Sequence, residues 1–72
     1  MKPPLLSGAR VVKALLRAGY RVVSQRGSHI KLCHDDKEIT LIVPNHKVVD
    51  RWTLKGIIRD AELSIDDFMK FV

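Results

Sequence analysis

The sequence predicts an α+β fold in which a helix, three antiparallel strands and a second helix follow one another, with a short helix at the C-terminal end. Apolar residues recur at helical spacing near both ends of the chain. Between them, apolar and polar residues alternate, and polar or glycine-containing clusters separate the alternating segments. Because only one face of the second and third strands is apolar, we expect a three-stranded antiparallel sheet with the helices on that face.

The length of the chain limits the kind of site it can build. With 72 residues, residues 1–72 are expected to form one domain. A domain of this length buries only about 60% of the surface that its unfolded chain exposes, which leaves a thin core. A deep pocket does not fit beside such a core, so any chemistry is expected at a shallow surface site without a cofactor.

The first helix is predicted over residues 7–18. Pro3-Pro4 favours extended backbone before it, and Ser7 is a suitable N-cap. Gly19 can end the helix in a left-handed conformation. The apolar stripe consists of Val11, Val12, Leu15 and Leu16.

The three strands are predicted over residues 20–25, 29–33 and 39–43. Arg26-Gly27 forms the first turn, because Gly27 can adopt a positive φ that other residues resist. The register of this hairpin stays open at this point. A two-residue turn pairs Ser24 with His29, whereas a three-residue turn pairs Gln25 with His29.

The second hairpin has a polar turn at residues 34–37. A four-residue turn there pairs Cys33 with Glu38 and His29 with Ile42. In this register the apolar side chains of both strands share one face, which supports the assignment. The opposite face is open and carries His29.

The C-terminal part is predicted to be helical after a loop over residues 44–50. Asp50 is a suitable N-cap for a helix over 51–61, and Ser64 caps a short helix over 65–71. The longer helix is amphipathic, with an apolar stripe of Leu54, Ile57, Ile58 and Ala61.

Charge and composition restrict the partners. A formal charge of +5 and a pI of about 9.8 favour nucleic acid, an acidic protein or an anionic surface. Cys33 is the single cysteine, which excludes an internal disulfide. Met1–Leu6 lacks the apolar core of a signal peptide, and no run is long enough to cross a bilayer, so we expect a cytoplasmic protein.

His29 is the first candidate for chemistry. An imidazole titrates near ~6.5 in water, so it can accept and donate protons at neutral pH. RNA strand scission requires a base, an acid and cations or N–H groups that stabilise the phosphate charge. Arg26 and Lys31 flank His29, and Gly27-Ser28 can present free N–H groups. The alternative is a strand histidine without a chemical role.

Other histidines and possible ligands carry weaker signals. His46 follows the third strand at the end where His29 begins the second, so it is either a second proton-transfer group or a structural contact. His34 lies in the far turn and is expected to be only solvated. No histidine, cysteine or carboxylate spacing matches a zinc or calcium site. Trp52 could stack on a base, although a tryptophan at a helix start more commonly packs on a loop.

Several short motifs in this order resemble the HicA (YcfA-like) mRNA interferase toxins. The resemblance covers nearly the whole chain. The motifs are Arg26-Gly27-Ser28-His29, Val43-Pro44-Asn45-His46 and Thr53-Leu54-x-x-Ile57-Ile58-x-x-Ala61-x-Leu63. Two positions depart from the family pattern: Trp52 and Glu62 stand where members commonly have glycine.

The resemblance implies a double-stranded-RNA-binding-domain-like fold and the toxin role of a type II toxin–antitoxin system. It implies a metal-independent endoribonuclease that cleaves mRNA, with His29 of the Gly-Ser-His motif as the catalytic residue. The partner would be a HicB-type antitoxin that covers the site. From their positions around His29, rather than from the resemblance, the residues expected to contact RNA are Arg26, Gly27, Ser28, Lys31 and His46.

Two other functions remain open on the residues alone. The basic face could belong to a non-catalytic RNA-binding module, which needs only phosphate and 2′-hydroxyl contacts. It could also belong to a protein-interaction module that meets an acidic partner. Salt-sensitive RNA binding without degradation is expected of the first, and no RNA affinity of the second.

Overall fold

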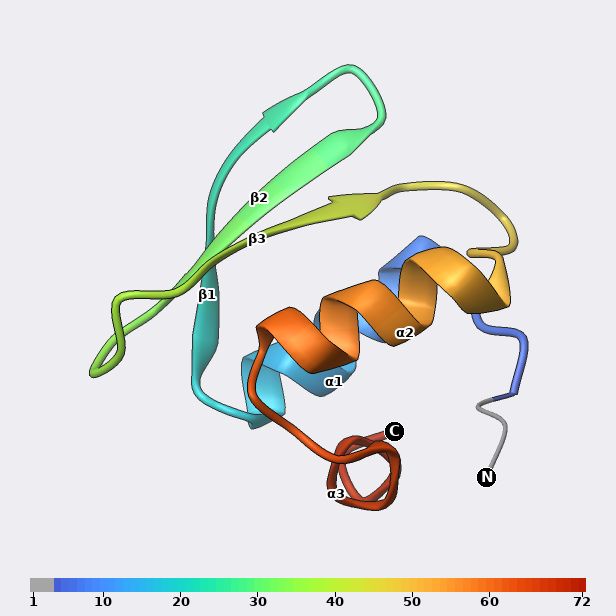
Figure 1. Ribbon diagram of the computed structural model, residues 1–72. Coiled ribbons are helices and arrows are strands. Elements are labelled where there is room, and N and C mark those ends of the chain that lie inside the picture. Colours follow the sequence, from blue (N-terminus) through green and yellow to red (C-terminus); the bar gives the residue numbers. More distant parts are fainter. Residues whose placement is uncertain (1–3) are drawn as a thin grey trace.

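A computed structural model describes residues 4–72 of the chain. The elements are α1 (Gly8–Arg17), β1 (Tyr20–Arg26), β2 (His29–His34), β3 (Thr40–Pro44), α2 (Arg51–Asp60) and α3 (Ile65–Met69). The strands form one antiparallel sheet in the order β1-β2-β3, and the helices lie on one side of it (Figure 1). The predicted α-β-β-β-α order with an open sheet is confirmed. The expected extended backbone at Pro3 lies outside the described residues.

All three helices begin at the predicted caps. In each, the side-chain oxygen of the cap accepts a backbone N–H three residues later, which satisfies one of the first four free donors of a helix. The pairs are Arg10 N to Ser7 Oγ (3.2 Å), Thr53 N to Asp50 Oδ1 (2.9 Å) and Asp67 N to Ser64 Oγ (3.0 Å). The helices end one or two residues earlier than predicted, because their last residues form turns.

Two residues just beyond helix ends adopt the left-handed conformation. Gly19 has a φ of 100°, as its position after α1 predicts. Glu62 has a φ of 59° after α2, and it is the one non-glycine residue with positive φ in the part of the chain that the structure describes. This is a position where the resembling family commonly has glycine, so the departure noted in the sequence has a backbone cost.

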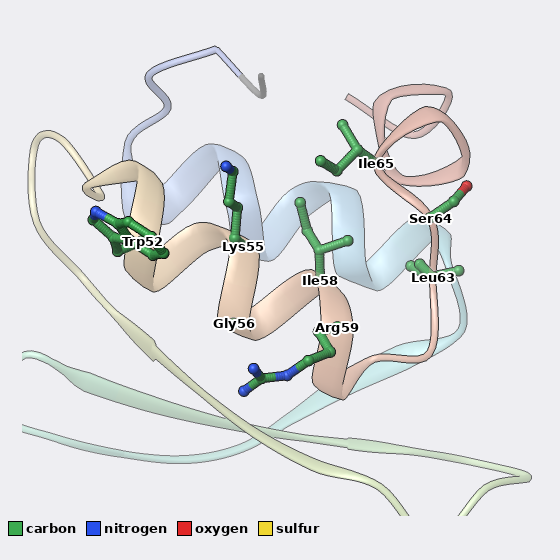
Figure 2. A pocket seen from close by; sticks show the side chains of 8 residues that line it. All are labelled: Trp52, Lys55, Gly56, Ile58, Arg59, Leu63, Ser64 and Ile65. Carbon is green, nitrogen blue, oxygen red and sulfur yellow. The ribbon is translucent and has the colours of Figure 1, made fainter. Parts of the chain in front are cut away.

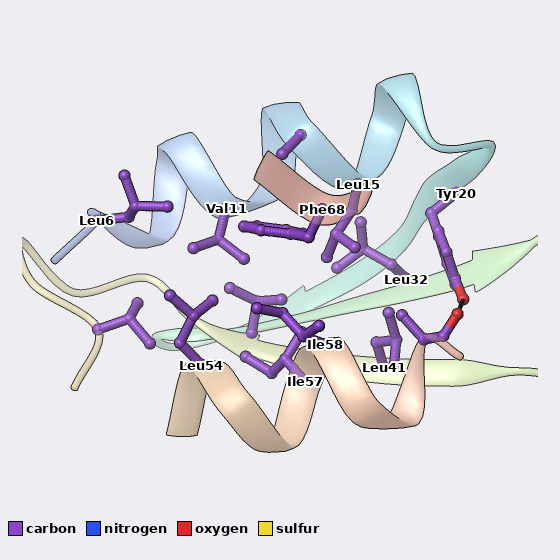
Figure 3. Packing of buried hydrophobic residues seen from close by; sticks show 14 of the residues in the cluster. Leu6, Val11, Leu15, Tyr20, Leu32, Leu41, Leu54, Ile57, Ile58 and Phe68 are labelled. Atoms are coloured by element: carbon purple, nitrogen blue, oxygen red, sulfur yellow. Dashed lines mark hydrogen bonds between the residues drawn. The ribbon is translucent and has the colours of Figure 1, made fainter. Parts of the chain in front are cut away.

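The core lies between the helices and the inner face of the sheet (Figure 3). The Tyr20 hydroxyl donates a hydrogen bond to the Ala61 carbonyl (3.1 Å) and so joins β1 to the end of α2. Burial, and secondarily the charge of Glu62, raises the pKa of Tyr20 above its usual value. The buried residues are Leu6, Val11, Ala14, Leu15, Tyr20, Ile30, Leu32, Leu41, Val43, Val49, Leu54, Ile57, Ile58, Ala61 and Phe68.

The first hairpin has a register that neither sequence alternative anticipated. Gly27-Ser28 forms the turn, with Gly27 at a φ of 55°, and Arg26 pairs with His29. The expectations that Ser24 or Gln25 would stand opposite His29 are therefore wrong. The register shifts between Val22 and Ser24, where a β-bulge adds one residue to β1. Bulges of this kind change which side chains face a given strand partner.

The second hairpin is shifted by two residues from the expected register. Cys33 pairs with Thr40 rather than Glu38, and His29 pairs with Pro44 rather than Ile42. The strand extends to His34, whose N–H donates to the Ile39 carbonyl (3.2 Å), so the turn begins later than predicted. A shift of two keeps every side chain on its predicted face, because strand side chains alternate with a period of two.

His34 explains the later turn. Its Nδ1 accepts the backbone N–H groups of Asp36 (3.0 Å) and Lys37 (3.2 Å). Its ring packs edge-on against Tyr20, with 4.8 Å between the ring centroids. A Cβ on Gly19 would lie only 2.8 Å from His34 Nε2. The expectation that His34 is merely solvated is wrong: it is half-buried and organises the turn.

The segment after β3 is held against the start of α1. Gly8 N–H donates to the His46 carbonyl (2.9 Å), and Val49 N–H donates to the Leu6 carbonyl (2.7 Å). Leu6 and Val49 form an isolated antiparallel bridge and are both buried. The predicted loop is therefore anchored at both of its ends.

Candidate functional site

The turn between β1 and β2 places Arg26 and His29 side by side. Arg26 is the last residue of β1 and pairs with His29, the first residue of β2. On its other side His29 pairs with Pro44 of β3. Gln25 Nε2 donates to the Gly27 carbonyl (3.1 Å), which stiffens the turn. The imidazole therefore belongs to the central strand, at the end of the open face, and Arg26 is its neighbour on β1.

Lys31 lies on the same open face as His29, two residues further along β2. Side chains two residues apart on a strand are separated by roughly 6–7 Å along its axis. Ser24 and Ile42 are the strand partners of Lys31, and both are exposed. The open face therefore presents a cation on each side of the imidazole: Arg26 across the ladder and Lys31 along the strand.

The backbone brings His46 to the same end of the sheet. Asn45 N–H donates to the Ser28 carbonyl (2.6 Å), so the chain after β3 is tied to the turn. His46 follows directly, and its carbonyl is held by α1 through Gly8. Its side chain is exposed. His46 is thus only two residues along the chain from Pro44, which is the strand partner of His29.

Four polar side chains at this end of the sheet are free to meet a ligand. Within residues 4–72, the side chains of Arg26, His29, Lys31 and His46 form no hydrogen bond or ion pair, and all four are exposed. Binding a ligand through these groups therefore does not first require an internal bond to break.

The charge around the turn is positive. The segments 24–31 and 40–47 contain no Asp or Glu, but they contain Arg26, Lys31 and Lys47. The next acidic residue along the chain, Asp50, caps α2. A hydrogen bond from the Thr53 backbone N–H, followed by one from the Thr53 hydroxyl, lowers the pKa of Asp50 below its ordinary value. An approaching polyanion therefore meets cations and N–H donors at this end of the sheet.

An exposed imidazole that has two cations near it can accept a proton from a hydroxyl beside a bound phosphodiester, or donate one to its leaving oxygen, while the cations stabilise the phosphate charge. Arg26, Gly27, Ser28, His29 and Lys31 lie around the turn between β1 and β2, and His46 lies at the same end of the sheet. In residues 4–72, no group of three or more His, Cys, Asp or Glu side chains is placed to hold a metal ion. None of the helices described is both long and apolar enough to cross a bilayer.

Two residues have surroundings that differ from those the sequence predicts. His34 has the structural role described above, which its position before Asp35-Asp36 could have suggested, since a histidine can accept N–H groups of a following turn. Trp52 is 84% exposed rather than packed on a loop. No signal in the sequence indicates that exposure.

Comparison with known protein families agrees with this fold and site. A family profile described as "HicA toxin of bacterial toxin-antitoxin" matches residues 8–63, which include all strands, the Gly27-Ser28 turn and α2. No curated protein matches the chain significantly. Because the matched region covers most of the 72 residues, the chain belongs to the HicA family of toxins from bacterial toxin–antitoxin systems.

Proposed function

We propose that this toxin is a metal-independent endoribonuclease that cleaves mRNA with His29 as general acid/base. The observation that carries the proposal is the exposed, unpaired imidazole on the open sheet face, with Arg26 as its strand partner and Lys31 two residues away. The family membership supports a toxin, and a nuclease on mRNA is a direct way for a small basic protein to stop growth.

The proposed reaction transfers the phosphodiester within the RNA. His29 removes the proton of a ribose 2′-hydroxyl, and the 2′-oxygen attacks the adjacent phosphorus. The bond from phosphorus to the 5′-oxygen breaks, and this oxygen takes up a proton. The products are a 2′,3′-cyclic phosphate and a 5′-hydroxyl. Arg26, Lys31 and the N–H groups of Gly27-Ser28 stabilise the charge on the phosphate.

The second proton-transfer group is open among water, Lys31 and His46. His46 is favoured by its backbone position, because the Asn45–Ser28 hydrogen bond holds its segment beside the start of β2. If His46 protonates the leaving oxygen, its substitution lowers turnover by about 10²–10⁴-fold, the usual contribution of a positioned acid or base.

The test is cleavage of an unstructured RNA by purified proteins in EDTA, with the product termini identified. We expect His29→Ala to lose about 10²–10⁴-fold in rate, since acid–base catalysis typically contributes that much. His29 is exposed, so the variant should remain folded, as circular dichroism can verify. Thr40→Ala, an exposed position near the other end of the same sheet face, serves as the control.

Three outcomes distinguish the alternatives. Equal cleavage by wild type and His29→Ala rules out the proposed role of His29. Salt-sensitive binding without cleavage by wild type would indicate a non-catalytic RNA-binding module. No RNA affinity at all would indicate a protein-interaction module.

We also propose that the cellular partner is a HicB-type antitoxin that covers the open face in the cytoplasm. An antitoxin that masks Arg26, His29 and Lys31 would need acidic or hydrogen-bonding groups opposite them. Expression of the toxin alone should arrest growth, and co-expression of the adjacent antitoxin gene should relieve the arrest. Growth arrest by His29→Ala would contradict the link between toxicity and cleavage.

The proposed toxin domain spans residues 1–72 and so extends beyond the matched region. Phe68 of α3 follows the match, yet it is fully buried among core residues of the other elements. Truncation before α3 would expose the pocket that this ring fills, and we expect such a chain to be unstable.

A further inference from the structure

A groove of about 680 Å³ runs along α2 and the start of α3, separate from the turn that carries His29. Figure 2 shows Trp52 at one end of this groove and Ile65 at the other. The α2–α3 groove is lined by Trp52, Lys55, Gly56, Ile58, Arg59, Leu63, Ser64 and Ile65.

Trp52 is the outstanding feature of the α2–α3 groove. It is the single tryptophan of the chain, and its 84% exposure is the highest among the large hydrophobic residues of the described part, residues 4–72. The ammonium of Lys55 lies 5.6 Å from the centroid of the indole ring. A flat ring that remains in water is suited to stack on another flat group, and the cation over the ring attracts negative charge next to that group.

The chemistry of the groove favours nucleic acid over an apolar protein segment. Ile58 is buried, and Leu63 and Ile65 are partly covered by the core, whereas Trp52 is the large apolar side chain of the groove that is open to water, at 84% exposure. Two cations, Lys55 and Arg59, line the groove, and no acidic side chain lines it. Arg59 Nε lies 3.4 Å from Asp60 Oδ1, and both side chains are exposed. Such a surface ion pair contributes little free energy, so Arg59 can bind another anion.

The path of the chain connects the α2–α3 groove to the proposed catalytic face. Residues 45–50 lead directly from the end of β3, beside His29, to the start of α2, where Trp52 is the second residue (Figure 1). His46 and Lys47 are exposed along this segment. A single strand that leaves the open face can therefore follow exposed basic residues to the indole ring.

We propose that Trp52 stacks on a nucleobase of single-stranded RNA, while Lys55 and Arg59 contact the neighbouring phosphates. The α2–α3 groove is then a second RNA contact outside the catalytic face, and it sets affinity rather than chemistry. This inference rests on the proposed function in one respect, namely that RNA is the substrate.

The single tryptophan makes the proposal directly measurable. The experiment uses the full chain with His29→Ala, so that RNA stays intact, and a short oligouridylate labelled at its 5′ end. Anisotropy of the label measures affinity, and Trp52 fluorescence measures contact with the ring. We expect RNA to quench the tryptophan emission with the same midpoint as the anisotropy change.

Substitutions separate the contribution of base stacking on Trp52 from that of electrostatic attraction to the RNA phosphates. Stacking of one base on an aromatic ring implies that Trp52→Ala weakens binding by roughly 5- to 150-fold, whereas Trp52→Phe retains most of the affinity. Leu16→Ala, at an exposed apolar position on α1, should not change it. Lys55→Ala should reduce the slope of log affinity against log salt by about one, with Lys37→Ala in the far β2–β3 turn as the charge-matched control.

With His29 intact, Trp52→Ala should raise the KM for RNA cleavage and leave kcat unchanged. RNA binding without quenching, with equal affinity for Trp52→Ala, would overturn this inference and leave the proposed function standing. If Trp52→Ala keeps its RNA affinity but no longer binds the antitoxin, the α2–α3 groove is a protein-docking site instead. Absence of RNA binding by every form would overturn both proposals.

Discussion

Gly8 at the start of α1 lies so close to the chain after β3 that no side chain fits there. A Cβ at this position would overlap the Pro44 carbonyl oxygen, and it would lie 2.8 Å from Asn45 Cα and 3.1 Å from His46 N. All three are backbone atoms, so none can rotate away. Gly8→Ala must therefore separate the start of α1 from the segment that carries His46.

The cost can be worked from the contacts that this separation breaks. The Gly8 N–H bond to the His46 carbonyl (2.9 Å) contributes about 0.5–1.5 kcal/mol. Overpacking adds about 1–3 kcal/mol, and the better helix propensity of alanine returns up to about 1 kcal/mol. We expect a net loss of about 0.5–4.5 kcal/mol, against a total stability of about 4–11 kcal/mol for a chain of this length.

Urea denaturation followed by far-ultraviolet circular dichroism measures this loss, with Gly56→Ala as a matched control. Gly56 lies within α2, and a Cβ there would meet only the Arg59 guanidinium, at 4.0 Å. The control should gain about 0.8–1 kcal/mol from helix propensity alone. The reasoning is refuted if Gly8→Ala matches or exceeds the wild type, or if the two variants shift in the same direction.

Two further predictions concern the ends of α2. The lowered pKa of Asp50 means that its ionised carboxylate stabilises the fold above its ordinary pKa of 3.8, and that this contribution is lost as the pH falls through the lowered folded-state value. The wild type should therefore be more stable than Asp50→Asn at neutral pH, and the difference should vanish in urea titrations at progressively lower pH; a difference that persists unchanged would contradict this. Glu62→Gly should relieve the backbone strain at this position, where φ is 59°. We expect the free energy of unfolding to rise by about 0.5–1 kcal/mol and Tm, measured by calorimetry, to rise by about 2–8 °C. Glu62→Ala keeps the left-handed strain, so an equal rise in Tm for both variants would show that charge removal, not backbone relief, is responsible.

Local signals in the sequence were sufficient for the helices. The sequence indicates Ser7, Asp50 and Ser64 as caps, because a side-chain oxygen just before a helix satisfies a free backbone N–H a few residues away. Gly19 was identified as a helix end for a similarly local reason. Such interactions span a few residues, so the rest of the fold hardly alters them.

The open face of the site was also predictable, although the pairing behind it was not. His29 and Lys31 were placed on the face opposite Ile30 and Leu32 by alternation alone, and alternation survives a register shift of two. The prediction of their exposure was therefore correct for a reason independent of the register. The partner of His29 was missed, because the bulge at Val22–Ser24 has no mark in the apolar pattern.

The sequence by itself determined the order of the elements, their caps and the face on which each side chain lies, since these follow from periodicity and short-range hydrogen bonds. Only the tertiary structure decided the registers, the anchoring of His46 against Gly8 and the exposure of Trp52. Two strand registers that differ by two residues bury the same side chains. The register is therefore set by contacts between residues distant in sequence, such as those of His34 with Gly19 and Tyr20. Trp52 is exposed because α2 turns Leu54, Ile57 and Ile58 toward the core, and no other described segment covers the ring.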